Sequence, residues 1–193
     1  MMRRAERHPI RAALLGAAAG AAGTAAMDLV GYRRYRKGGG TEGLTPWETA
    51  ENVNKWADAP APAQFGKRVF ERITRHDLPD HRARCTTNLV HWATGIGWGA
   101  QFGLVNGLWR RHQVVLGVLF GPAVWLAGYV ILPLAKVYKP IWEYDRATLV
   151  KDFGAHMAYG SVTAASFAAL ARQSREYRPE WLSAGDLPAQ RRK

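Results

Sequence analysis

Four long stretches with almost no charge alternate with charged segments along the chain. They are residues 12–32, 87–109, 113–135 and 153–171, and Asp28 is the one formal charge among them. A helix needs roughly 20 mostly apolar residues to cross a bilayer, and each stretch comes close to that length. The pattern predicts an all-α fold, an integral membrane four-helix bundle with an amphipathic helical loop between helices 1 and 2.

The alternative is a soluble helical protein whose core is built from small residues. Residues 87–109 argue against it, because 23 uncharged residues that end in Trp109 are hard to keep in water. Residues 12–32 and 153–171 are rich in alanine and glycine, so we expect neighbouring helices to take up their polar groups. The third stretch, 113–135, contains the most hydrophobic run of the four.

Basic segments surround these stretches and divide the chain into three parts. Residues 1–11 form a basic N-terminal tail, 12–171 a four-pass membrane domain, and 172–193 a basic C-terminal tail. The net charge of +12 is spread over loops beside the apolar stretches. We therefore expect the partners to be the lipid bilayer and its anionic headgroups, and not nucleic acid. A homo-oligomer is left open.

The connecting loop, residues 33–86, carries helix signals of its own. In "TPWE", Thr45 is the expected N-cap, Pro46 the first helical residue, and Glu48 the end of a capping box. "APAPA" then breaks that helix. Farther on, "QFGKRVFERITRH" has an apolar face with basic residues around it, which suits a helix lying among headgroups. The alternative there is a soluble helix packed on another part of the loop.

Small residues recur at every fourth position within the stretches, which keeps them near one helix face. Membrane helices gain stability through close approach, so small residues line their contacts. We therefore expect a packing role for Gly16, Gly20, Gly95, Gly99, Gly103, Gly107, Gly117, Gly121 and Gly160.

Three ionisable residues should lie at a similar depth beneath the long loop. Asp28 lies about one turn before the end of its stretch, and His91 and His156 lie about one turn inside theirs. Such residues mostly face the interior of a helix bundle. One interpretation is a polar cluster that pairs helices near the interface. The others are a proton or solute pathway in a small channel or transporter, and a haem or divalent metal site.

A second group of possible ligands lies in the loop, at His76, His81 and Cys85. A zinc site is conceivable there, and helix capping at the junction is the alternative. Cys85 is the single cysteine, so no internal disulfide forms. The sequence contains no nucleophile elbow, Ser-His-Asp order or phosphate loop, so we expect a non-enzymatic protein. We also expect no cofactor, unless the haem or metal interpretation above holds.

Orientation and processing depend on short basic segments. Lys and Arg are almost balanced between the two sides, and we place the termini in the cytoplasm because of the tight Arg110–Arg111 hairpin. The basic start and the short apolar region of small residues are also compatible with a cleaved signal peptide.

Several segments together resemble a known family. The first small-residue helix ending near Asp28, "HWATGIGWGAQFG", "GPAVWLAGYVILPL" and "HMAYGSVTA" are similar to the YagU-like family of bacterial multi-pass inner-membrane proteins. The resemblance spans roughly residues 10–171. It implies an inner-membrane location, no established catalytic residues, and a connection to envelope or acid stress. The basic loop that contains tryptophan has no counterpart in the resemblance.

Overall fold

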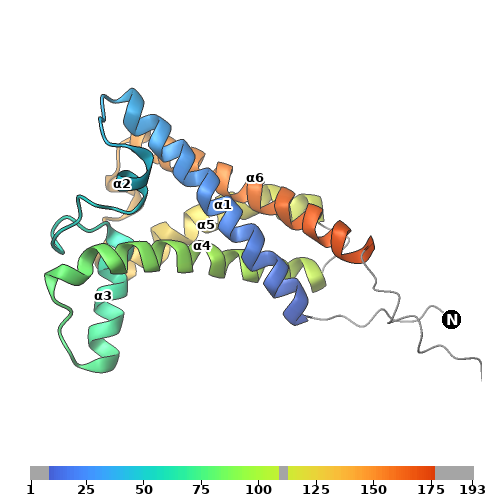
Figure 1. Cartoon of the computed structure of the whole chain (residues 1–193), viewed down its shortest axis with the longest axis horizontal. Helices are drawn as coiled ribbons and strands as arrows, with labels where there is room; N and C mark the ends of the chain where they lie inside the picture. Colours follow the sequence, from blue (N-terminus) through green and yellow to red (C-terminus); the bar gives the residue numbers. More distant parts are fainter. Residues whose placement is uncertain (1–8, 109–112, 177–193) are drawn as a thin grey trace, which may run out of the picture.

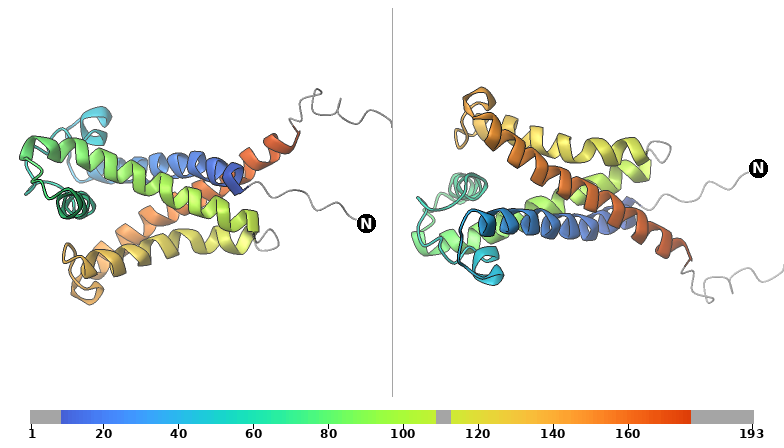
Figure 2. Two further views of the ribbon diagram at one scale, coloured as in Figure 1. Left: turned by 90° about the horizontal axis from the view of Figure 1, so that it is seen from below. Right: turned by 90° about the horizontal axis from the view of Figure 1, so that it is seen from above.

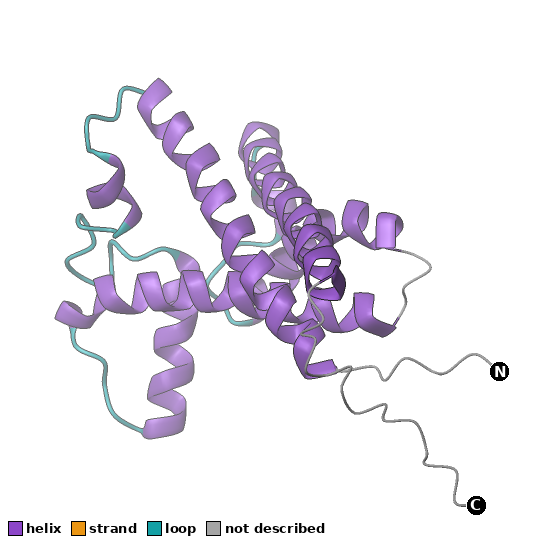
Figure 3. Ribbon diagram, turned by 45° about the vertical axis from the view of Figure 1, so that its right-hand side comes forward, coloured by secondary structure: helices purple, strands orange, loops and turns teal. Residues whose placement is uncertain are grey.

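The computed structural model describes residues 9–108 and 113–176, and within these ranges every regular element is helical. The long helices are α1 (Pro9–Lys37), α4 (Ala83–Leu108), α5 (Gln113–Leu134) and α6 (Arg146–Glu176). The short elements are α2 (Leu44–Glu48), α3 (Ala61–Thr74), and the 3-10 turns η1 (Asp80–Arg82) and η3 (Ile141–Glu143). The all-α prediction is confirmed for the described residues (Figure 3).

The four long helices alternate in direction (Figures 1 and 2). The start of α1, the end of α4, the start of α5 and the end of α6 lie together at one end of the molecule. The short elements α2, α3, η1 and η3 lie at the opposite end, which we call the loop end. Helix α1 packs along both α4 and α6, and α5 packs mainly on α6.

Two of the described helices are long and apolar enough to cross a membrane: Pro9–Lys37 and, within α5, Val115–Leu134. This statement rests on length and composition, which core helices and signal sequences can share. The sequence predicted four crossings, but α4 and α6 do not meet the same hydropathy test. The reason is that an uncharged stretch is not always apolar. His91 and Gln101 in α4, and His156 and Ser161 in α6, lower the mean hydropathy of their helices.

The outer helices are longer than their uncharged stretches. Helix α1 continues through Arg33 and Arg34 to Lys37, and α6 begins at Arg146 rather than near residue 153. Lysine and arginine are good helix formers, so a helix does not end where charge begins. Three basic residues in the last turn of α1 also interact favourably with the C-terminal end of the helix dipole. Residues 1–8 and 177–193 of the predicted tails lie outside the described residues.

Glycines bring α1 and α4 into backbone contact. A methyl group on Gly20 would lie 2.6 Å from the carbonyl oxygen of Gly95 and 2.8 Å from the Cα of Gly99. Gly103 likewise faces the Cα of Gly16, at 3.0 Å from where a Cβ would stand. At these positions a side chain has no space, so the close approach of the two helices requires glycine.

Glycines also bring the backbones of α5 and α6 together. An aromatic core then links this helix pair to the pair formed by α1 and α4. Cβ atoms built on Gly121 and Gly160 would press against each other's helix. Away from this contact, the Phe102 ring lies 4.6 Å from that of Phe120 and 5.6 Å from that of Phe167, measured between centroids. At the edges, Cβ positions on Gly107 and Gly117 meet only alanine methyl groups, at 3.2 and 3.1 Å.

The predicted capping box at the start of α2 is wrong. The N-cap is Gly43, which makes no side-chain cap hydrogen bond, and Thr45 lies inside the helix. The helix ends at Glu48, and Ala50 has a φ of +50°, which is incompatible with a longer helix. Glu48 points to the long helices instead of to its own N-terminus, as its contacts below show.

The rest of the loop folds around a small core of its own. Val53, Ala59, Ala63 and Ala83 are buried together, and Trp56 packs against them. The indole Nε1 of Trp56 donates a 2.7 Å hydrogen bond to the carbonyl oxygen of Leu78. The predicted break at "APAPA" is also the start of α3, because Pro60 is its N-cap and Pro62 stands in its first turn.

Candidate functional site

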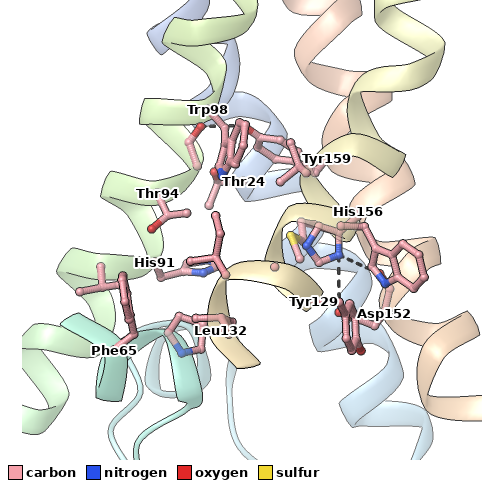
Figure 4. A pocket seen from close by; sticks show the side chains of 18 of the residues that line it. Thr24, Phe65, His91, Thr94, Trp98, Tyr129, Leu132, Asp152, His156 and Tyr159 are labelled. Atoms are coloured by element: carbon pink, nitrogen blue, oxygen red, sulfur yellow. Dashed lines mark hydrogen bonds and ion pairs between the residues drawn. The ribbon is translucent and has the colours of Figure 1, made fainter. Parts of the chain in front are cut away.

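A cavity of about 330 Å³ lies near the loop end, between α1, α3, α4, α5 and α6. Figure 4 shows its lining side chains. Most of the wall is apolar or aromatic. The ionisable or hydroxyl-bearing side chains that line it are Thr24, His91, Thr94, Tyr129, Tyr138, Asp152, His156 and Tyr159. A mainly apolar cavity with a few polar groups is the usual form of a small-molecule site.

One polar pair joins α1 to α4. The Nε2 atom of His91 lies 2.8 Å from Oδ1 and 3.0 Å from Oδ2 of Asp28. The Asp28 side chain is only 12% exposed, so the histidine supplies much of its hydrogen bonding. The two residues that the sequence placed at one depth are therefore in direct contact.

Glu48 from the short helix α2 completes this group, which we call the acid cluster: Asp28, His91 and Glu48. Its Oε1 atom is buried without a hydrogen-bond partner. Burial raises the pKa of the Glu48 carboxyl above its ordinary value, the negative charge of Asp28 raises it further, and His91 acts in the opposite direction. Trp92 is close enough for a side-chain hydrogen bond to the ionised form. The cluster thus brings two carboxyl groups and one imidazole together at the loop end.

His156 lies on another part of the wall, away from the acid cluster. Its Nδ1 atom is 3.0 Å from the carbonyl oxygen of Asp152 and 3.5 Å from the Asp152 Oδ1 atom. The side chain of Tyr129 lies close enough to Asp152 for the two groups to interact electrostatically. Figure 4 shows His156, Asp152 and Tyr129 on the side of the cavity opposite His91.

The glycine contacts explain why the two histidines are not equivalent. In the first helix pair, Gly20 of α1 packs against Gly95 and Gly99 of α4. In the second pair, Gly121 of α5 packs against His156 and Gly160 of α6. When the two helix pairs are aligned on these contacts, His156 of α6 corresponds to Gly95 of α4. Asp152, one turn before His156, then corresponds to His91. With this one-turn offset, His156 contacts Asp152 and not the pair of Asp28 and His91, although both histidines line the cavity.

Two residues of the site were missed from the sequence. Glu48 was assigned to a helix cap, and no local signal distinguishes the two roles. Asp152 stands four residues before His156, a spacing at which helical side chains meet, and this signal was visible.

The described parts of the chain contain no group of side chains that supports a metal site. Within residues 9–108 and 113–176, no three His, Cys, Asp or Glu side chains converge so that they could hold a metal ion. In the loop, His76 Nδ1 lies 2.7 Å from the carbonyl oxygen of Thr74, His81 belongs to η1, and Cys85 is exposed. The haem alternative for His91 and His156 stays a prediction.

No protein-family model matches the chain, and no curated protein or solved structure matches it significantly. The functional argument therefore rests on the chain's own residues.

Proposed function

We propose that this chain is a non-enzymatic, four-pass protein of a bacterial inner membrane that senses acid through the acid cluster. The observation that carries the acid response is the placement of Glu48, from the loop, beside Asp28 and His91 of the long helices.

The surface of the long helices supports the membrane part of the proposal. Large apolar side chains are exposed along all four of them: Leu14 and Leu29 on α1, Leu89 and Ile96 on α4, Val118 and Leu126 on α5, and Val150 and Phe153 on α6. Exposed apolar surface of this extent marks contact with lipid or another apolar partner. Of the polar residues that lower the hydropathy of α4 and α6, His91 and His156 line the cavity, whereas Gln101 and Ser161 are exposed together with apolar side chains.

Helix α3 supports contact with headgroups. It stands across the direction of α4 at the loop end, as a helix lying in the membrane surface would (Figures 1 and 3). Phe70 and Ile73 are 42% and 76% exposed, and Arg68 and Arg72 are exposed beside them. An exposed apolar face flanked by basic side chains suits an anionic lipid surface.

The native Cys85 allows the topology to be tested directly. It is exposed at the loop end, so four crossings with cytoplasmic termini place it on the periplasmic side of the membrane. We expect a membrane-impermeant maleimide to label Cys85 in spheroplasts. A Cys85→Ser, Gln173→Cys variant, with its cysteine at the other end of the molecule, should react only after permeabilisation. The reverse pattern would overturn the orientation, labelling of both from outside would overturn four crossings, and release by carbonate would overturn membrane integration.

The acid response follows from linkage at Glu48. Because docking of α2 raises the pKa of this carboxyl, protonation of Glu48 must strengthen docking. The groups that face it are Asp28 from α1, and His91 and Trp92 from α4. Nearby, Arg84 holds the segment after α2 by pairing with Glu51 at 3.1 Å.

Hydrogen exchange of α2, corrected for intrinsic exchange rates, measures this docking. In the wild type we expect protection of α2 to be greater at pH 5 than at pH 7.5. Glu48→Gln, which mimics the protonated carboxyl, should show similar protection at both values. Equal protection of the wild-type helix at the two pH values would refute the acid response.

A further inference from the structure

We propose that the cavity wall around Asp152 binds a small organic cation, an alkylated ammonium group held between the carboxylate and the rings of Trp125, Tyr129 and Tyr138. This site goes beyond the proposed acid response and does not depend on it. It occupies the side of the cavity formed by α5, α6 and the segment between them, away from the acid cluster (Figure 4).

The aromatic residues form a continuous wall. The ring centroids of Trp125 and Tyr129 are 5.1 Å apart, and those of Tyr129 and Tyr138 are 5.7 Å apart. All three residues line the cavity. Aromatic faces attract cations within about 6 Å, and cages of such rings are the known means of holding quaternary ammonium groups.

Other rings hold this wall in place from behind. Tyr144 packs edge-on against Tyr129 at 5.3 Å, and Phe153 packs edge-on against Trp125 at the same distance. Neither supporting residue lines the cavity. A wall fixed before the ligand arrives loses little conformational entropy on binding.

Asp152 supplies a negative charge that no strong cation neutralises. Among the described residues, its ion-pair contact is with His156, at 3.5 Å, and no lysine or arginine pairs with it. Arg34 comes near this turn but donates to the backbone carbonyl of Lys151. The Asp152 side chain is 32% exposed, so a ligand can reach it. Burial, followed by the negative charge of Asp152, raises the pKa of Tyr138 to about 12, so that hydroxyl stays neutral.

The chemistry of the wall favours an organic cation over a metal ion. Divalent metal ions require several oxygen ligands, whereas this wall offers one carboxylate and aromatic faces. The buried Nε1 atom of Trp125 has no hydrogen-bond partner, which is rare for a buried donor. A ligand that carries an oxygen acceptor near its ammonium group would pair its cation with the Asp152 carboxylate and accept a hydrogen bond from Trp125 Nε1. The cavity volume of about 330 Å³ is large enough for a small organic cation.

Calorimetric titration of the full chain in a maltoside detergent, with tetramethylammonium chloride as probe, tests the site. We expect saturable binding that sodium chloride does not reproduce. Asp152→Asn should weaken it at least about tenfold. Asp58→Asn is the matched control, because it makes the same chemical change in an exposed carboxylate that does not line the cavity, and should leave affinity within about twofold.

A second pair of variants keeps the test valid if Asp152→Asn does not fold. Tyr138→Phe retains the ring and should retain binding, whereas Tyr138→Leu should lose about threefold or more. The proposal is overturned if the wild type shows no saturable binding of tetramethylammonium, if Asp58→Asn weakens binding as much as Asp152→Asn, or if Tyr138→Leu binds like the wild type. The acid response is measured at Glu48, and cation binding is measured at Asp152 and Tyr138, so failure of one proposal leaves the other standing.

Discussion

Replacement of Gly99 by alanine tests whether backbone contact between α1 and α4 holds the long helices together. The added methyl group would lie 2.5 Å from the Cα of Gly20 and would also meet the carbonyl oxygen of Gly16. Ordinary contacts of a Cβ atom begin near 3.4 Å, so the two backbones must separate by about 1 Å. Overpacking of this kind costs roughly 1–3 kcal/mol.

Gly97→Ala is the matched control on the same helix, because a Cβ at Gly97 meets nothing within 4 Å. Both substitutions gain the same helix propensity, about 1 kcal/mol, so their difference isolates the contact. For a chain of this size, about 1 kcal/mol corresponds to roughly 2–4 °C in Tm. We therefore expect Gly99→Ala to melt about 2–12 °C below Gly97→Ala.

Circular dichroism of both variants in the same detergent gives the two melting temperatures. Equal values, or a more stable Gly99→Ala, would refute the close packing of α1 on α4. Loss of helix content in both variants alike would show that neither substitution reports on the contact.

Three further predictions concern the loop end. The folded chain binds a proton at Glu48 more readily than the unfolded chain, so the free energy of unfolding should fall as pH rises above 4.5. Melting curves between pH 4.5 and 7 measure this decrease, and it should be smaller in Glu48→Gln. Trp56→Phe removes a 2.7 Å hydrogen bond and should cost about 1 kcal/mol and speed tryptic cleavage of the loop, whereas Trp142→Phe, at a residue 81% exposed, should do neither. A bimane label at Ile73→Cys, in a chain without the native cysteine, should be quenched by brominated lipids; quenching no stronger than that of a label at Lys55→Cys would contradict an interfacial α3.

Elements with strong periodic signals were predictable. The four uncharged stretches correspond to the four long helices, and α3 was expected from its amphipathic pattern, although the prolines before it were predicted only to break the preceding helix. Helix α2 was expected at "TPWE", but its cap was wrong, since Gly43 takes the N-cap position and Ala50 ends the helix through a positive φ. Five residues carry too little periodic signal to fix where a helix begins.

The polar site was predictable only in part. The contact between Asp28 and His91 follows from two inward-facing positions near the same ends of neighbouring helices. Glu48 reaches them through the tertiary path of the loop, which hydrogen bonds from Arg84 and Asn88 to Thr49 hold against α4. No pattern within "TPWE" encodes those contacts.

The pattern of side chains along the sequence was enough to predict that the described residues are helical, where the long helices lie, and which face of each carries glycine. These properties are local, because the helical period of 3.6 residues and the side-chain types decide them. Only the tertiary structure decided how far one helix slides along another. Glycine contacts set that register separately for α1 with α4 and for α5 with α6, and the one-turn offset between them keeps His156 apart from the contact between His91 and Asp28. The offset arises from backbone contacts between distant residues, which is why it was not visible in the spacing along either helix.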